Sequence, residues 1–263
     1  MLSKPSIHIS STRMLMVAPH RDFAVHQHAV LQVTFALDEE PFEVWTEATG
    51  WASTTGVIID ANIPHALRVQ QGWQATTCII PQTAPAKWLK ESVLQEAPVL
   101  LLNGTEFNPV KEDLLNLSRA VLPDGETFDE LTNRIYNCLL KNKYLFYPMD
   151  QRIRSVLLYI QEHITEGLSA AELAAHIHLS ENRFLHLFKE KMGIPVRQYI
   201  VWQRMATAFG FFLAGRSLKE AAYESGFSDP AHFTRSFVQI NGVQPSAYAP
   251  LKDHFAFRYF PEA

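Results

Sequence analysis

The 263-residue chain has little cysteine, no excess of positive charge and no long apolar run. Its two cysteines, Cys78 and Cys138, stand far apart, which is too few for a disulfide framework or a sulfur-ligated zinc site. Apolar runs such as Val99–Leu102 are far shorter than the roughly 20 residues that span a bilayer, and residues 1–10 hold no apolar signal-peptide core. We therefore expect a protein of the reducing cytoplasm that neither crosses a membrane nor is exported.

The charge balance argues against a uniformly basic nucleic-acid binder, because 23 lysines and arginines stand against 27 aspartates and glutamates. The two halves of the chain differ, however. Residues 1–149 hold 11 basic and 16 acidic side chains, for a net charge of −5, whereas residues 150–263 hold 12 and 11, for +1. With 47% apolar residues the chain can bury a sizeable core, and its length fits two domains of about 100–200 residues each.

The sequence pattern of the first half changes near residue 81. Residues 14–81 contain short β-branched and aromatic runs, such as Leu31–Leu37, separated by turn-forming residues, which is typical of a sandwich or a small barrel. Between about residues 86 and 140, apolar side chains recur three and four apart, which predicts two or three amphipathic helices. Residues 141–148 show no clear period, so we interpret them as the connector to a second domain.

The second half contains an internal repeat. Ser169 and Glu172, and again Ser217 and Glu220, have the spacing of a capping box at the start of a short helix. A second cap follows in each copy, and a longer helix then ends at a glycine. The equivalent pairs at an offset of 49 residues are Phe184 and Phe233, His186 and Arg235, Phe188 and Phe237, Gly193 and Gly242, and Tyr199 and Tyr248. This pattern predicts two helix-turn-helix motifs, at about 169–192 and 217–241, bridged by a long helix over Pro195–Ala214.

A helix-turn-helix can place its second helix in the major groove of DNA. In both copies the aromatic side chains of the second helix should face the core and leave polar side chains outside. The outward side chains are Asn182, Arg183, His186 and Lys189 in the first copy and His232, Thr234, Arg235 and Gln239 in the second. A polar outer face can also merely solvate a helix. The duplication favours DNA binding, since side chains of this kind contact base edges and phosphates.

One block of the second copy is distinctive: Gly226–Pro230 is followed by Phe233, Arg235, Phe237, Gly242, Pro245 and Tyr248. Together with Leu168–Ala174 and Leu179–Gly193, this block resembles the AraC/XylS family of bacterial transcription regulators over roughly residues 150–250. The resemblance implies a DNA-binding domain that acts on promoters, together with RNA polymerase, as activator or repressor. His186 stands where the family commonly has arginine, and Leu185 and Val238 replace polar or basic residues. Because these changes remove cations, we expect weak non-specific DNA binding.

The same resemblance implies an N-terminal cupin-like domain that senses a small-molecule effector, followed by helices that form a homodimer. Two apolar stripes suit such a dimer, although they can equally pack down on the sheet domain. The stripes consist of Leu114, Leu117 and Val121 and of Leu131, Ile135 and Leu139.

Three histidines of the first half suggest a ligand site. His26 and His28 lie two residues apart, so on a strand both point to one face, and His65 can approach from a facing strand. Such a set can bind a metal, which raises the alternative of a cupin-type metal enzyme fused to a DNA-binding domain. Gln32 stands near the position where metal-binding cupins have a carboxylate, and an amide is a poor ligand for a transition metal. We therefore predict that the three histidines bind an effector, or serve only the core, and that there is no metal or other cofactor.

Aromatic side chains of the first half can line a pocket for the effector or simply fill the core. They are Phe23, Phe35, Trp45, Trp51 and Trp73. We find no sequence pattern of a catalytic triad, a phosphate-binding loop or paired catalytic carboxylates, so we predict no enzyme activity. The prediction as a whole is a cupin-like sensing and dimerisation domain over residues 1–145, and an all-α domain over residues 150–263 that binds promoter DNA.

Overall fold

The computed structural model describes most of the chain. It covers residues 5–10, 12–19, 22–38, 40–68, 71–95, 97–117, 125–140, 149–254 and 256–260. The predicted connector at residues 141–148, the predicted boundary at residue 145 and Val121 of the predicted stripe lie outside these ranges.

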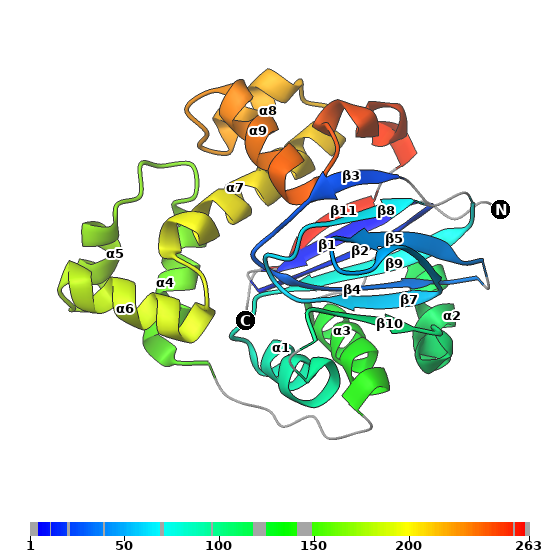
Figure 1. Cartoon of the computed structure of the whole chain (residues 1–263). Coiled ribbons are helices and arrows are strands. Elements are labelled where there is room, and N and C mark those ends of the chain that lie inside the picture. The colour runs from blue at the N-terminus through cyan, green and yellow to red at the C-terminus, as the bar shows by residue number, and fades with distance from the viewer. Residues whose placement is uncertain are drawn as a thin grey trace.

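Two β-sheets face each other in the N-terminal part (Figure 1). The larger sheet has the strand order β10 (Val99–Leu102), β7 (Gly56–Ile59), β4 (Leu31–Ala36), β9 (Trp73–Ile79), β2 (Arg13–Pro19), β1 (Ser6–Ser10) and β11 (Ala256–Phe260). The smaller sheet has the order β3 (Phe23–His26), β8 (His65–Arg68), β5 (Phe42–Thr46) and β6 (Gly50–Thr54). The predicted cupin-like fold is confirmed, and the sheets extend beyond the predicted range at both ends.

The larger sheet is covered on both faces. Along β2 the side chains alternate, so Leu15 and Val17 point to one face while Met14 and Met16 point to the other. The Leu15 face is covered by α1 (Ala84–Trp88), the π-helical turn η1 (Leu89–Leu94), η2 (Thr105–Phe107), α2 (Asn108–Leu117) and α3 (Gly125–Leu140). A hydrogen bond of 2.8 Å between the hydroxyls of Tyr136 and Thr77 joins α3 to β9. The Met16 face looks toward the smaller sheet and the C-terminal helices.

The predicted dimer stripes pack against the sheet of their own chain. Leu114, Leu117, Leu131 and Ile135 are at most 8% exposed and belong to the core between α2, α3 and the larger sheet. Leu139 is partly buried against the same core. Of the two interpretations of these leucines, the structure shows the second, in which the stripes cover the sheet. The leucines are therefore core residues, and they do not present a surface to a second copy.

The C-terminal helices follow the predicted repeat. They are α4 (Gln151–Glu162), α5 (Ala170–His176), α6 (Glu181–Met192), α7 (Val196–Leu213), α8 (Leu218–Glu224), α9 (Pro230–Asn241) and the 3₁₀ segment η3 (Pro245–His254). The pairs α5 and α6, and α8 and α9, are the two helix-turn-helix units, and α7 bridges them (Figure 1). Among the helices in the described ranges, none is long and apolar enough to span a membrane.

Most of the predicted N-terminal caps form the expected side-chain hydrogen bonds. Ser217 and Glu220 form a full capping box, and the Asp229 carboxylate accepts a hydrogen bond of 2.7 Å from the His232 amide. Ser169 also caps its helix, but Glu172 accepts from the Tyr159 hydroxyl at 2.7 Å, so the first capping box is only half formed. Ser180 occupies the N-cap position of α6 without a side-chain cap bond.

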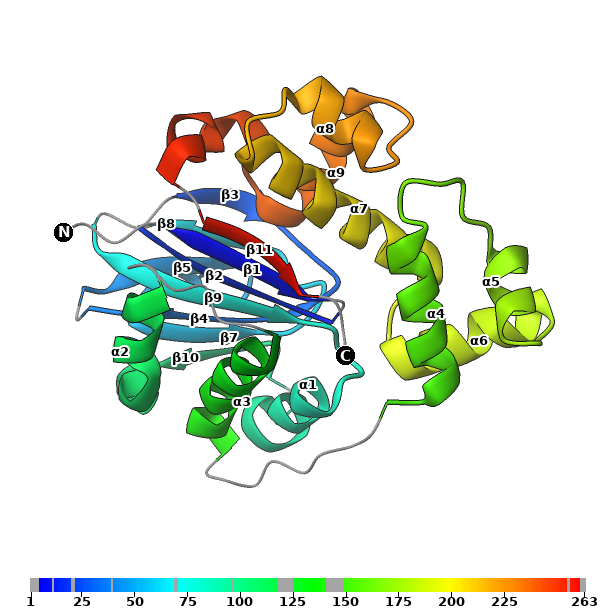
Figure 2. The ribbon, with the colours of Figure 1, turned by 180° about the vertical axis from the view of Figure 1, so that it is seen from behind.

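The last strand departs from the predicted division of the chain. Residues 256–260, which were assigned to the C-terminal domain, form β11 and pair in parallel with β1, with Ser6 opposite Ala256 and Ser10 opposite Phe260 (Figure 2). The Ala256 amide donates a further hydrogen bond of 2.9 Å to the Pro5 carbonyl. The helical domain is thus attached to the N-terminal sheets through the chain on both of its sides.

Candidate nucleic-acid interface and effector cavity

The outer face of α6 carries the predicted polar residues. Asn182, Arg183, His186 and Lys189 are all exposed, while Phe184, Leu187 and Phe188 are buried against neighbouring helices. This separation is what an amphipathic helix with a 3.6-residue period produces. Contact of the four outer side chains with DNA stays a prediction.

On α9 the predicted residues differ in exposure. Arg235 and Gln239 are exposed, whereas Thr234 and His232 are partly buried. The His232 ring lies edge-on to Phe227, with centroids 5.2 Å apart, so this histidine also helps to hold the turn before α9. Phe233 and Phe237 point inward, as predicted.

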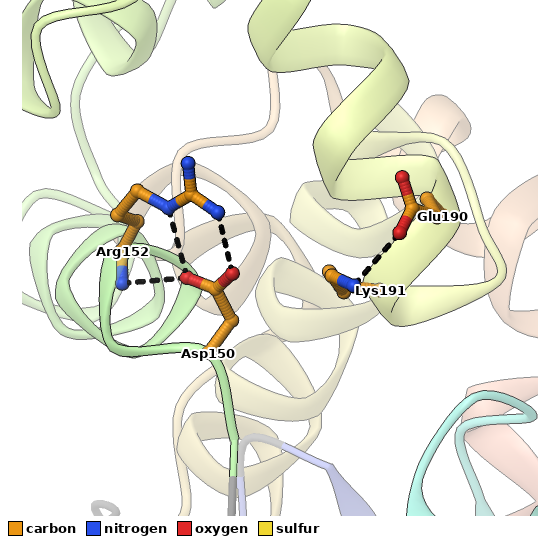
Figure 3. Close-up of polar contacts among 4 residues, drawn as sticks. All are labelled: Asp150, Arg152, Glu190 and Lys191. Atoms are coloured by element: carbon orange, nitrogen blue, oxygen red, sulfur yellow. Dashed lines mark hydrogen bonds and ion pairs between the residues drawn. The ribbon is translucent and has the colours of Figure 1, made fainter.

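Two cations near α6 are already paired with carboxylates (Figure 3). The Arg152 guanidinium donates to both oxygens of Asp150, at 3.1 and 2.7 Å, and this contact holds the pKa of Asp150 below its usual value. The Lys191 ammonium lies 2.7 Å from a Glu190 oxygen. Arg183 and Lys189 form no ion pair of this kind with any residue of the described ranges. We therefore expect Arg183 and Lys189, rather than Arg152 and Lys191, to meet phosphates.

A cavity that is partly open to solvent lies between the N-terminal sheets and the C-terminal helices. Its walls are apolar and come from both parts of the chain, including Ile7, Met16 and Phe23 from the sheets and Trp202 and Phe209 from α7. The polar side chains of the lining include those of His26, His28, Gln32, Thr76, Asn241 and Tyr248. The described lining contains no lysine, arginine, aspartate or glutamate.

The lining only partly matches the aromatic residues singled out from the sequence. Phe23 lines the cavity, but Phe35 stacks on Phe107 in the other core, with centroids 3.9 Å apart. Trp51 lies on the outside of the smaller sheet under the Arg68 guanidinium, 4.1 Å from it. The lining residues of α7 were missed because apolar side chains on a bridging helix carry no signal beyond helix packing.

The three predicted histidines come together at the edge of this cavity. His26 and His65 are opposite each other in the pairing of β3 with β8, and His28 lies two residues beyond the end of β3. The ring centroids of His26 and His65 are 4.3 Å apart, and those of His28 and His65 are 5.0 Å apart. Burial lowers the pKa of His26 to about 4 and that of His65 to about 3, and it lowers the pKa of His28 as well. All three rings are therefore neutral near pH 7.

The second recognition helix ends against these histidines. Gly242, at the C-terminal cap of α9, has φ +69° and lies so close to β3 that a Cβ there would be 2.7 Å from the Ala24 carbonyl oxygen and from His26 Nδ1. Ile240 and Asn241 of α9 line the cavity itself. The C-terminal end of α9 therefore lies beside both the cavity and the histidines.

Comparison with known proteins finds similarity in the helical part of the chain. Residues 173–250 match a family model described as a helix-turn-helix domain. The chain is 32% identical over 109 residues to the arabinose operon regulatory protein of Salmonella typhimurium. The matched region covers 41% of this chain and 39% of that protein. It is 28% identical over 130 residues to the probable transcriptional regulator LumQ of Photobacterium leiognathi, covering 48% and 52%. Residues 173–250 therefore form a helix-turn-helix domain similar to that of these AraC-type regulators. The chain spans about half or less of the length of these curated relatives.

A protein of known structure also matches most of this chain. ToxT from Vibrio cholerae aligns over 91% of this chain and 98% of its own length, with a TM-score of 0.56 and 15% sequence identity. The likeness shows a shared two-domain fold, with a sheet-rich N-terminal domain and a helix-turn-helix domain.

Proposed function

We propose that the chain is a cytoplasmic transcription regulator that binds promoter DNA through α6 and α9 and responds to a small molecule. The observation that supports DNA binding best is the repeated helix-turn-helix, in which both second helices expose hydrogen-bonding and cationic side chains. In this role Asn182, Arg183, His186 and Lys189 contact one segment of the major groove. His232, Thr234, Arg235 and Gln239 contact another, and α7 sets the spacing between the two helices.

The cavity is the proposed effector site. One solved structure of ToxT has an unsaturated fatty acid bound. In the present chain an apolar cavity with a few polar side chains fits a ligand that is mostly apolar. His26 and His28 line this cavity and offer hydrogen bonds to such a ligand, whereas His65 stands behind them. Since α7 and α9 form part of the wall, an effector that fits one arrangement of the domains better than another changes the population of DNA-binding states.

RNA polymerase and a second copy of the chain are the proposed protein partners. The leucine stripes of α2 and α3 are core residues, which supports a homodimer interface on another surface.

DNA binding is tested by selecting sites from a random duplex library with the purified chain and then mapping them by footprinting. We expect selected sites with two contacted segments on one face of the duplex. Arg183→Ala should weaken binding to these sites, whereas Lys87→Ala, at an exposed position of α1 and in neither recognition helix, should leave it unchanged. Recovery of no enriched sequence would contradict the proposal.

A further inference from the structure

We propose that His26, His28 and His65 form a binding site for a divalent transition-metal ion such as Zn²⁺. The sequence alone argued against a metal, because Gln32 stands where a carboxylate would be expected. The structure adds two observations that the sequence could not supply, the convergence of the three rings and an unpartnered nitrogen on His65.

The three rings present nitrogens to a common point. One ring nitrogen from each histidine lies within 4.8 Å of those of the other two. Zinc binds imidazole nitrogen at about 2.0–2.1 Å, so a tetrahedral ion would draw these nitrogens to roughly 3.4 Å from one another. Small rotations of the rings can produce this change. His26 is only partly buried and lines the cavity, which gives the ion a path from solvent.

Backbone hydrogen bonds fix the ring nitrogen that remains available. Nδ1 of His26 bonds to the Ala24 carbonyl at 2.8 Å, Nδ1 of His28 to the Val30 carbonyl at 2.9 Å, and Nδ1 of His65 to the Ile63 carbonyl at 2.8 Å. A carbonyl only accepts, so in each neutral ring Nδ1 carries the proton and Nε2 keeps its lone pair. Histidines that ligate metals in proteins are usually held in this way.

His65 carries the second observation. Its side chain is fully buried, and its Nε2 has no hydrogen-bond partner among the residues that the structure describes. A buried nitrogen without a partner costs free energy, and a cation bound to its lone pair removes that cost. His28 Nε2 lies 2.8 Å from the end of the Gln32 side chain, whose NH2 group donates to this nitrogen when the amide is turned toward the ring. This amide has to turn away when His28 binds an ion.

The chemistry of the site selects the class of ion. Three neutral imidazoles suit zinc, copper, nickel and iron, whereas calcium and magnesium require oxygen ligands. The fourth position faces Gln32 or the cavity, where water or a donor atom of a ligand can complete the coordination.

The position of the site suggests a consequence that rests on the proposed function. His26 lies against Gly242 at the end of α9, so an ion that fixes the His26 ring also acts on the second recognition helix. Metal binding should therefore change the affinity of the chain for DNA.

The metal site is tested on the full chain without DNA, after removal of bound metal with a chelator. Calorimetric titration with Zn²⁺ should show one ion per chain, and Co²⁺ should give visible absorption bands of a nitrogen-ligated site. His65→Ala should weaken Zn²⁺ binding at least tenfold. Gln32→Glu should tighten it about tenfold, because the carboxylate adds a charged ligand. His178→Asn, at an exposed position of the first helix-turn-helix unit, is the matched control and should bind like the unchanged protein.

Each result decides one point. Absence of saturable binding by the unchanged chain overturns the proposal, and so does equal binding by a folded His65→Ala variant. If His65→Ala does not fold, Gln32→Glu takes its place, and a failure to tighten binding overturns the site. DNA affinity is then measured with and without Zn²⁺. An unchanged affinity refutes the link to α9 but not the metal site, whereas absence of any DNA binding refutes the proposed function alone.

Discussion

Arg235 and His186 occupy equivalent positions of the two recognition helices, and both side chains are exposed. A guanidinium is always charged and can bond bidentately to guanine or to a phosphate. An imidazole is shorter and offers two ring nitrogens in place of the five N–H donors of a guanidinium. At the scale of single residues, the second helix-turn-helix unit is therefore the stronger candidate for reading the site.

We expect Arg235→Ala to cost about 1–3 kcal/mol of binding free energy at a selected DNA site. His186→Ala should cost less at pH 7.5. Binding isotherms of the unchanged chain and both variants at several salt concentrations measure the two losses of binding free energy. A larger loss for His186→Ala than for Arg235→Ala at pH 7.5 would reverse the ranking.

At the scale of helices and strands, local sequence signals predicted the helices of the repeat. They did not predict the contacts that these helices and the strands make with distant parts of the chain. Caps such as Ser217 and Asp229 and the glycines at 193 and 242 act on the backbone beside them. The sequence therefore predicted where α5, α6, α8 and α9 begin, and where α6 and α9 end, to within one or two residues. The approach of His65 to His26 depends on the register of β8 against β3, which is a long-range pairing. The contact of Gly242 with β3 depends on how the domains pack, and no local pattern encodes it.

Gly242→Ala tests the contact between α9 and β3. An alanine at φ +69° is strained by about 1–2 kcal/mol, and here its Cβ would also collide with the Ala24 carbonyl, a backbone atom that cannot move aside alone. Gly50→Ala is the matched control, since Gly50 has φ +63° and open space around the position of a Cβ. Urea denaturation should therefore show a larger loss of stability for Gly242→Ala than for Gly50→Ala. Equal losses would mean that α9 does not press on β3 in solution.

At the scale of the whole molecule, the two domains are less separate than the sequence suggested. One hydrophobic core runs from Ile7 and Met16 of the larger sheet to Phe209 and Phe237 of the helical domain. The helical domain is followed by β11, which returns to the first strand of the chain. Residues 256–260 lie about 250 positions from their partners, so no local pattern predicts this pairing. A fragment meant to fold and bind DNA by itself should therefore end near His254.

Removal of β11 should loosen the attachment of the DNA-binding domain. A chain that ends at His254 loses the parallel pairing with β1, which leaves backbone groups of β1 without strand partners on that side. Because Ile7 and Ile9 of β1 also line the cavity, we expect a lower denaturation midpoint and weaker binding of any cavity ligand, with DNA binding retained.

A chain that ends at Phe260 keeps β11 and serves as the control. If the two truncated chains show the same denaturation midpoint, β11 does not hold the domains together. If the shorter chain loses DNA binding while it remains folded, DNA binding requires β11, contrary to the expected result.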